Sequence, residues 1–249
     1  MMRCMKIFAG ITAIFIFQAP AVLAATFQDA NARFEAGEYK EASQIYEALV
    51  AQKKSSAVVY YNLGNTYFRL KQRGKALLNY ERARRLAPRD ADIRWNIEVV
   101  KTTLMDKIQT EQGSFVLNGL KSLTRRVTAD ETTLLFTAIL LLFFVLTIFN
   151  FFVAPLRPSA GPLQGIVFLV LIATAVLGII QWLDEKDPRV VILKPEVFAR
   201  YGPSKEETKA FLIHEGAEGR VIDESKEWLD IKLPDGQSGW IPKTTCEVV

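Results

Sequence analysis

Two apolar runs, 134–153 and 166–183, constrain this chain more than any other feature of its sequence. The first run reads LLFTAILLLFFVLTIFNFFV and contains no charged residue. A helix rises 1.5 Å per residue, so a run of this length reaches about 30 Å, the thickness of the hydrocarbon layer of a bilayer. We therefore expect transmembrane helices at 132–154 and 166–183. Buried helices of a soluble domain are the alternative.

The segment between the runs, expected as a short turn at 155–165, brings the chain back to the side it came from. Its first part, PLRPSAGP, holds three prolines and a glycine, which end one helix before the next begins. The two spans thus form a hairpin, and both soluble parts of the chain lie on the same side of the membrane.

Two sequence features disagree about which side that is. Residues 1–24 resemble a signal peptide: Arg3 and Lys6 precede an apolar run, and small or apolar residues follow Pro20. Such a signal places the domains outside the cytoplasm, whether it is cleaved or stays as an anchor. The excess of Lys and Arg next to the spans favours the cytoplasm instead. We follow the signal peptide and expect a bacterial inner-membrane protein with periplasmic or extracytoplasmic domains.

The segment 25–108 repeats itself at a period of 34 residues. A shift of 34 superposes Phe34 on Phe68, Ala42 on Ala76 and Tyr46 on Tyr80. Small residues and aromatics at fixed sites of such a period resemble the tetratricopeptide repeat (TPR), an α-solenoid of antiparallel helix pairs. The second copy matches best, and residues 91–106 indicate a lone last helix.

The resemblance to TPR proteins implies a groove lined by the first helix of each pair. The groove positions of the family fall here on Asn31, Phe34, Glu35, Tyr61, Asn65, Phe68, Arg69 and Trp95. Bound there, a protein segment would meet the Asn65 amide through its backbone and Arg69 through an acidic group. Alternatively, Phe34, Phe68 and Trp95 simply pack between helices.

The linker at 109–131 carries apolar residues at helical spacing between Val116 and Val127. An amphipathic helix at the headgroup level and a helix packed on the TPR stack both fit this pattern. Thr128 and Glu131 then form a capping-box sequence that starts the first span.

The segment 184–249 has the short β-prone runs and turn residues of a small closed β-barrel. The segment 197–204, VFARYGPS, and the later GWIP at 239–242 resemble the bacterial SH3-like (SH3b) domain. That resemblance implies a cell-wall or protein ligand near Tyr201, Trp228 and Trp240. Core packing is the alternative for both tryptophans.

No pattern of residues predicts catalysis or a cofactor. His214 is the single histidine, and Cys4 and Cys246 are the two cysteines, so we expect no metal site and no enzyme. A net charge of +4 spread along the chain does not indicate nucleic-acid binding. The expected fold class is multidomain α plus β: TPR α-solenoid, transmembrane hairpin and SH3-like barrel.

The order of these parts is similar to the BatE-type TPR proteins of bacterial aerotolerance (Bat) operons, as are LNYERA at 78–83 and DIRWN at 92–96. This resemblance implies a non-enzymatic scaffold or adaptor in an envelope stress complex. Its implied partners are membrane proteins with von Willebrand A domains and a MoxR-type ATPase system. A peptidoglycan-binding tether at the inner membrane is the alternative.

Overall fold

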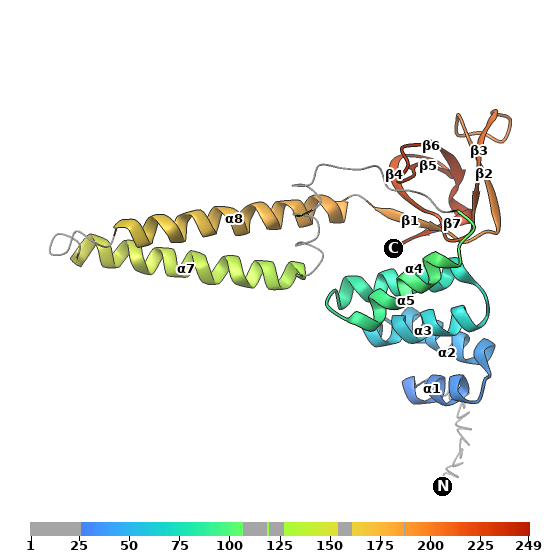
Figure 1. Ribbon diagram of the computed structural model, residues 1–249, viewed down its shortest axis with the longest axis horizontal. Helices are drawn as coiled ribbons and strands as arrows, with labels where there is room; N and C mark the ends of the chain where they lie inside the picture. Colours follow the sequence, from blue (N-terminus) through green and yellow to red (C-terminus); the bar gives the residue numbers. More distant parts are fainter. Residues whose placement is uncertain (1–25, 107–118, 120–126, 154–160, 187) are drawn as a thin grey trace, which may run out of the picture.

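The chain folds into a stack of helices, a long two-helix hairpin and a C-terminal antiparallel sheet (Figure 1). The computed structural model describes residues 26–106, 119, 127–153, 161–186 and 188–249. The expected signal peptide at 1–24 and most of the expected amphipathic linker at 109–131 lie outside the described residues.

The stack consists of two antiparallel helix pairs and a last single helix. In chain order these are α1 (Phe27–Glu35), α2 (Tyr39–Ala51), α3 (Ala57–Arg69), α4 (Arg73–Leu86) and α5 (Ala91–Thr102). The helices α1, α3 and α5 begin at side-chain caps, Thr26, Ser56 and Asp90, whose oxygens accept hydrogen bonds from backbone N–H groups of the first turn. The lone last helix expected from the sequence is α5, which ends at Thr102.

Small residues let the helices of the stack approach closely, as the repeat pattern predicts. A Cβ atom added to Gly64 would lie 2.7 Å from the ring of Tyr80. Ala30, Ala42 and Ala76 are fully buried at the other crossings. A larger side chain at any of these sites would separate helices that share one core.

The hairpin consists of α7 (Ala129–Val153) and α8 (Gly161–Lys186), both long and apolar enough to cross a membrane. Its start is the predicted capping box: the backbone N–H of Glu131 donates to Thr128 Oγ1, and that of Thr128 donates to the Glu131 carboxylate. Residues 161–165, expected in the turn, are helical, because Pro162 fits the first turn of a helix. Apolar side chains remain exposed along both helices.

The sheet has seven strands in the order β3-β2-β6-β5-β4-β1-β7, all neighbours antiparallel. The strands are β1 (Arg189–Ile192), β2 (Glu196–Arg200), β3 (Lys209–His214), β4 (Glu218–Ser225), β5 (Trp228–Lys232), β6 (Ser238–Pro242) and β7 (Cys246–Val248), with a short 3-10 helix, η3 (Lys243–Thr245), before the last. The β-prone runs of the sequence lie at 190–193, 197–201, 211–214, 219–222, 228–233 and 239–241, and β1 to β6 each overlap one of them. Strand β7 was not predicted. Among the described strands no pairing joins β3 to β7, so the pairing itself does not close a barrel.

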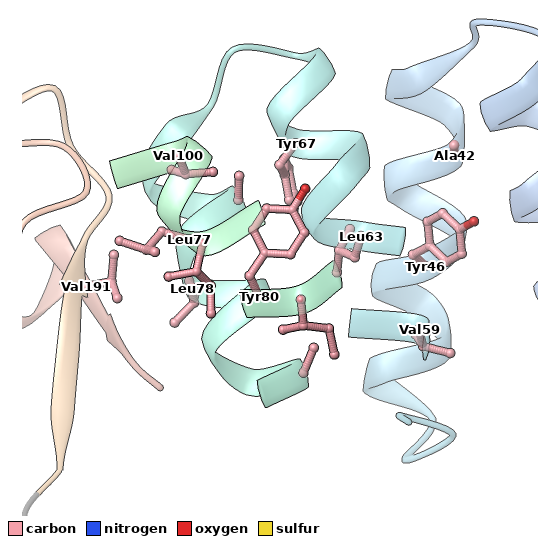
Figure 2. Packing of buried hydrophobic residues seen from close by; sticks show 14 of the residues in the cluster. Ala42, Tyr46, Val59, Leu63, Tyr67, Leu77, Leu78, Tyr80, Val100 and Val191 are labelled. Atoms are coloured by element: carbon pink, nitrogen blue, oxygen red, sulfur yellow. The ribbon is translucent and has the colours of Figure 1, made fainter. Parts of the chain in front are cut away.

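The sheet is docked on the stack, which the sequence did not indicate. Helix α4 lies between α3 and strand β1, and Val191 of β1 belongs to the same buried cluster as Leu77 and Leu78 of α4 (Figure 2). The backbone N–H of Gly74 donates a 2.8 Å hydrogen bond to the Glu215 carboxylate. Stack and sheet therefore share a continuous apolar contact.

Candidate protein-binding surface

The helices α1, α3 and α5 carry all the groove residues expected from the sequence; we call the side formed by these residues the first-helix surface. Asn31, Phe34 and Glu35 lie on α1, Tyr61, Asn65, Phe68 and Arg69 on α3, and Trp95 on α5. Glu35, Arg69 and Trp95 are exposed, and the others are half-buried. The exposed members are the ones that a partner could reach without rearrangement.

Asn65 holds the stack together through its side-chain carbonyl. Its Oδ1 accepts a 2.6 Å hydrogen bond from the Tyr80 hydroxyl and a 3.1 Å bond from Nδ2 of Asn96. Burial raises the pKa of Tyr80, so its hydroxyl remains a donor at physiological pH. The side-chain carbonyl of Asn65 is therefore already occupied within the stack.

The same arrangement recurs one repeat earlier. Oδ1 of Asn31 accepts a hydrogen bond from the Tyr46 hydroxyl and a 3.1 Å bond from Nδ2 of Asn62. Each of these residues lies 34 positions before its counterpart in the Asn65 network. Nδ2 of Asn31 and Nδ2 of Asn65 have no hydrogen bond to another described residue, so each is the part of its amide that can donate to a ligand.

An aromatic residue occupies the same position in each first helix. Phe27 packs on Tyr46 with ring centroids 6.1 Å apart, and Tyr61 packs on Tyr80 at 5.9 Å. Trp95 follows Tyr61 by 34 positions, but the residue 34 positions after Tyr80 is Ser114. No third tyrosine is available, and the Trp95 side chain is 69% exposed.

The two phenylalanines of the surface pack within the stack. Phe34 lies edge-on to Tyr39 at 5.3 Å between ring centroids, and both Phe34 and Phe68 rest against the buried core. The surroundings of Phe34 and Phe68 therefore match the alternative that these rings pack between helices. Trp95 differs from them, since most of its ring area faces solvent.

Charges of opposite sign lie on neighbouring first helices. Glu35 on α1 and Arg69 on α3 occupy equivalent positions one repeat apart, and both are exposed. Within the described part of the chain no carboxylate forms an ion pair with Arg69. Its guanidinium can therefore form a bidentate pair with an incoming acidic group.

The three aromatic residues expected at a ligand site of the C-terminal sheet differ in exposure. Tyr201 is 71% exposed, Trp240 is half-buried, and Trp228 is only 9% exposed. Trp240 pairs with Arg200, the neighbour of Tyr201, across β2 and β6. The sheet thus brings Tyr201 and Trp240 close in the strand register, whereas Trp228 packs against the body of the domain.

A further exposed aromatic on the sheet was missed. Phe198 lies on the outward side of β2 between the buried Val197 and Ala199, and the Lys209 ammonium sits 3.8 Å from its ring centroid. Leu212 on β3 is the register partner of Phe198. The alternation in EVFAR at 196–200 indicates an outward Phe198, and this was the available signal.

The histidine and the described cysteine have structural surroundings. The backbone N–H and Nδ1 of His214 each lie 2.7 Å from a carboxylate oxygen of Asp106, which ties the segment after α5 to β3. Cys246 is buried, and burial raises the pKa of its thiol to about 11. Within the described residues no three His, Cys, Asp or Glu side chains gather as a metal site would require.

Comparison with known families identifies the repeats. Residues 30–71 match the family described as TPR repeat, and residues 57–90 match the tetratricopeptide repeat. A search of curated proteins finds no match to the chain. Tetratricopeptide repeats thus occupy residues 30–90, and such repeats support a role in binding other proteins.

Proposed function

We propose that this chain is a non-enzymatic, membrane-anchored scaffold that binds a segment of a partner protein on its first-helix surface. The observation that carries the proposal is that, among the described residues, the C-terminal sheet contacts the stack at α4, whereas side chains of the first-helix surface remain exposed. At the contact with the sheet, Arg82 of α4 pairs with Glu247 and donates to the carbonyl oxygen of Val248. On the first-helix surface Trp95 and Arg69 face solvent.

The chemistry of that side favours an extended segment with an apolar and an acidic residue. Trp95 offers apolar area, which a bound side chain would shield from water. Arg69 offers a fixed pair of donors for a carboxylate. Asn31 and Asn65, held by their tyrosines, each present an Nδ2 donor to the backbone of the segment.

The proposed location and partners of the scaffold rest on the resemblance to the BatE-type proteins. We propose an extracytoplasmic site at the bacterial inner membrane, in an envelope stress or aerotolerance complex. Its proposed partners are membrane proteins with von Willebrand A domains and a MoxR-type ATPase system. The C-terminal sheet would be an SH3b-like domain, with Tyr201 and Trp240 better placed for a ligand than the buried Trp228.

A pull-down from detergent-solubilised membranes tests the proposal. The full chain carries a tag, and co-purified proteins are compared between wild type, Arg69→Glu and Trp95→Ala. Both variants change exposed side chains, so the fold is expected to persist while the partner is lost. Lys40→Ala, an exposed change on the second helix α2, is the matched control. Equal recovery with all four proteins contradicts the proposal.

Asn65→Ala is a poorer probe of this surface. It removes the acceptor for the Tyr80 hydroxyl and the Asn96 amide, so lost binding could reflect a loosened stack. Tyr80→Phe is the control for a loosened stack, because it weakens the same hydrogen-bond network without changing the first-helix surface. Binding by Tyr80→Phe together with loss in Asn65→Ala would assign the effect to the Asn65 amide.

A second candidate function, a tether to peptidoglycan, rests on the exposure of Tyr201. Because Val191 and Glu215 of the sheet contact the stack, the whole chain is needed for the test. The purified protein in detergent is sedimented with isolated cell wall, and Tyr201→Ala is compared with wild type. A protein that stays in the supernatant excludes the tether.

A further inference from the structure

We propose that one end of the repeat stack, formed by the turns α2–α3 and α4–α5, lies on the membrane surface and contacts anionic lipid headgroups. We call this end the basic end and define it by Lys53, Lys54, Val58, Arg85, Leu86 and Arg89. The proposal goes beyond protein binding on the first-helix surface. It rests on the hairpin as a membrane anchor, which belongs to the proposed function.

The position of the headgroup layer can be read from the domain-side end of the hairpin. Nε2 of Gln181 donates a 3.0 Å hydrogen bond to the carbonyl oxygen of Val127, so this part of α8 is level with the start of α7. The next residue, Trp182, is 54% exposed on the outside of α8. Exposed tryptophans at the end of a span characteristically lie among headgroups.

The α4–α5 turn is fixed at this same level. Arg89 in the turn pairs at 3.1 Å with Glu131, which lies in the first turn of α7. A small open pocket beside the pair is lined by residues of the turn together with Thr128 and Glu131. Figure 1 shows this end of the stack beside the base of the hairpin. The turn is therefore at the height where the chain enters the bilayer.

The α2–α3 turn lies at the same end of the stack. Helices α2 and α3, and likewise α4 and α5, are consecutive antiparallel neighbours in contact, so the turns that join them emerge on one side (Figure 1). The turns α1–α2 and α3–α4 emerge on the opposite side. The turns α2–α3 and α4–α5 thus both face the level of the headgroup layer at the domain-side end of the hairpin.

Basic and apolar side chains gather at this end. Lys53, Lys54, Arg85 and Arg89 are exposed, and Val58 and Leu86 are 56% and 53% exposed. Of the acidic residues near the α4–α5 turn, Asp90 caps α5 and Glu131 pairs with Arg89, whereas Asp92 and Asp130 are exposed. The α2–α3 turn carries Lys53 and Lys54 and no acidic residue, so the excess of positive charge at this end lies there. Exposed basic residues interleaved with exposed apolar ones match an anionic bilayer surface, where cations meet phosphates and short apolar side chains enter the interface.

The experiment measures how close this end comes to lipid in the full chain. Leu86→Cys, in a Cys4→Ser background, is labelled with an environment-sensitive fluorophore; Cys246 is buried and labels slowly. Gln72→Cys, an exposed residue of the opposite α3–α4 turn, is the matched control. Both proteins are reconstituted in vesicles of phosphatidylcholine with or without phosphatidylglycerol, and quenching by a lipid carrying a headgroup nitroxide is recorded.

We expect strong quenching of the label at position 86 in phosphatidylglycerol vesicles and weak quenching at position 72. Each basic side chain near an anionic surface contributes about fivefold in affinity, so changing Lys53, Lys54 and Arg85 to Gln should bring the quenching at position 86 close to that at position 72. Equal quenching at both positions overturns the proposal.

Flotation separates failure of this proposal from failure of the anchor. A chain that does not float with the vesicles overturns both the anchor and the membrane contact of the basic end. A chain that floats but leaves the label at position 86 in water overturns the membrane contact alone. The pull-down with Arg69→Glu and Trp95→Ala reports on the first-helix surface independently of either result.

Discussion

The backbone N–H of Gly74, at the start of α4, donates a 2.8 Å hydrogen bond to the side chain of Glu215, which lies 141 residues later in the turn between β3 and β4. A Cβ atom at position 74 would lie 2.5 Å from the carbonyl oxygen of Ile192. The absence of a side chain at Gly74 therefore sets how closely the stack and the sheet approach. Parts of the chain separated by two candidate membrane spans meet at this contact.

Gly74→Ala should weaken the contact between stack and sheet. The added methyl group must displace the β1 backbone, and overpacking of this kind costs about 1–3 kcal/mol. Chemical denaturation followed by circular dichroism measures the change. The neighbouring Arg73→Ala is exposed and serves as control. If both variants unfold at the same denaturant concentration, the close approach at Gly74 does not contribute to the free energy of unfolding.

Tyr80→Phe should destabilise the stack by about 1 kcal/mol, because one neutral hydrogen bond to Asn65 is lost while Asn96 still donates to the same oxygen. Tyr46→Phe should have a similar effect through Asn31. Equilibrium unfolding of both variants checks this. A loss for one tyrosine and none for the other would show that the two networks are not equivalent.

Cys246 should react slowly with iodoacetamide in the folded protein. Burial raises the pKa of its thiol from 9.0 to about 11, and the thiolate fraction at neutral pH then falls about 100-fold. Because the folded pKa is the higher one, stabilisation by the protonated thiol is full below pH about 9 and is lost as the pH approaches about 11.

Mass spectrometry of a Cys4→Ser chain follows the alkylation with and without denaturant. Fast labelling of the folded protein would mean that Cys246 is accessible. The pH dependence is checked by unfolding wild type and Cys246→Ala between about pH 8 and about pH 11. This range begins below the unfolded pKa of the thiol and reaches the folded one. The stability of wild type relative to the variant should fall as the pH rises.

Polar side chains near the turn of the hairpin should fix how α7 and α8 pair. Asn150 Nδ2 donates to Gln164 Oε1 at 2.6 Å, and Gln164 Nε2 donates to Thr147 Oγ1 at 3.0 Å. Replacing Asn150 and Gln164 by Leu should weaken the pairing by about 1 kcal/mol while leaving membrane insertion intact.

Disulfide formation between Phe143→Cys and Phe168→Cys measures that pairing, since these rings lie 5.8 Å apart across the hairpin. Thr137→Val is the control, because the Thr137 hydroxyl bonds within its own helix. Unchanged cross-linking after the loss of Asn150 and Gln164 would mean that apolar packing alone fixes the helix pair.

The repeats and the two long apolar helices could be predicted because each follows from a local sequence pattern. An uncharged run of bilayer length and a 34-residue period need no knowledge of distant contacts. The turn at 234–236 was likewise predictable, and Gly236 there adopts a positive φ of 92°. Strand β7 was missed because three residues are too short to show an alternation.

The docking of sheet on stack could not be predicted, because it joins residues far apart in sequence. A partial signal existed in the consecutive apolar residues Ala76, Leu77 and Leu78, which cover more than one side of α4 and are all buried. Nor did the sequence predict that Asn65 accepts hydrogen bonds within the stack. Its 34-residue spacing from Asn31, shared with the pair Tyr46 and Tyr80, indicates an internal hydrogen bond as readily as a ligand contact.

The most direct test of this account is membrane topology, because the contact of Gly74 with Glu215 requires stack and sheet to share one side. Single cysteines at Lys40, Lys226 and Ser159 report on the stack, the sheet and the segment between the spans. A membrane-impermeant thiol reagent is applied to sealed vesicles of known orientation. We expect labelling of positions 40 and 226 from the same side of the membrane and of position 159 from the other. Labelling of positions 40 and 226 from opposite sides would contradict it.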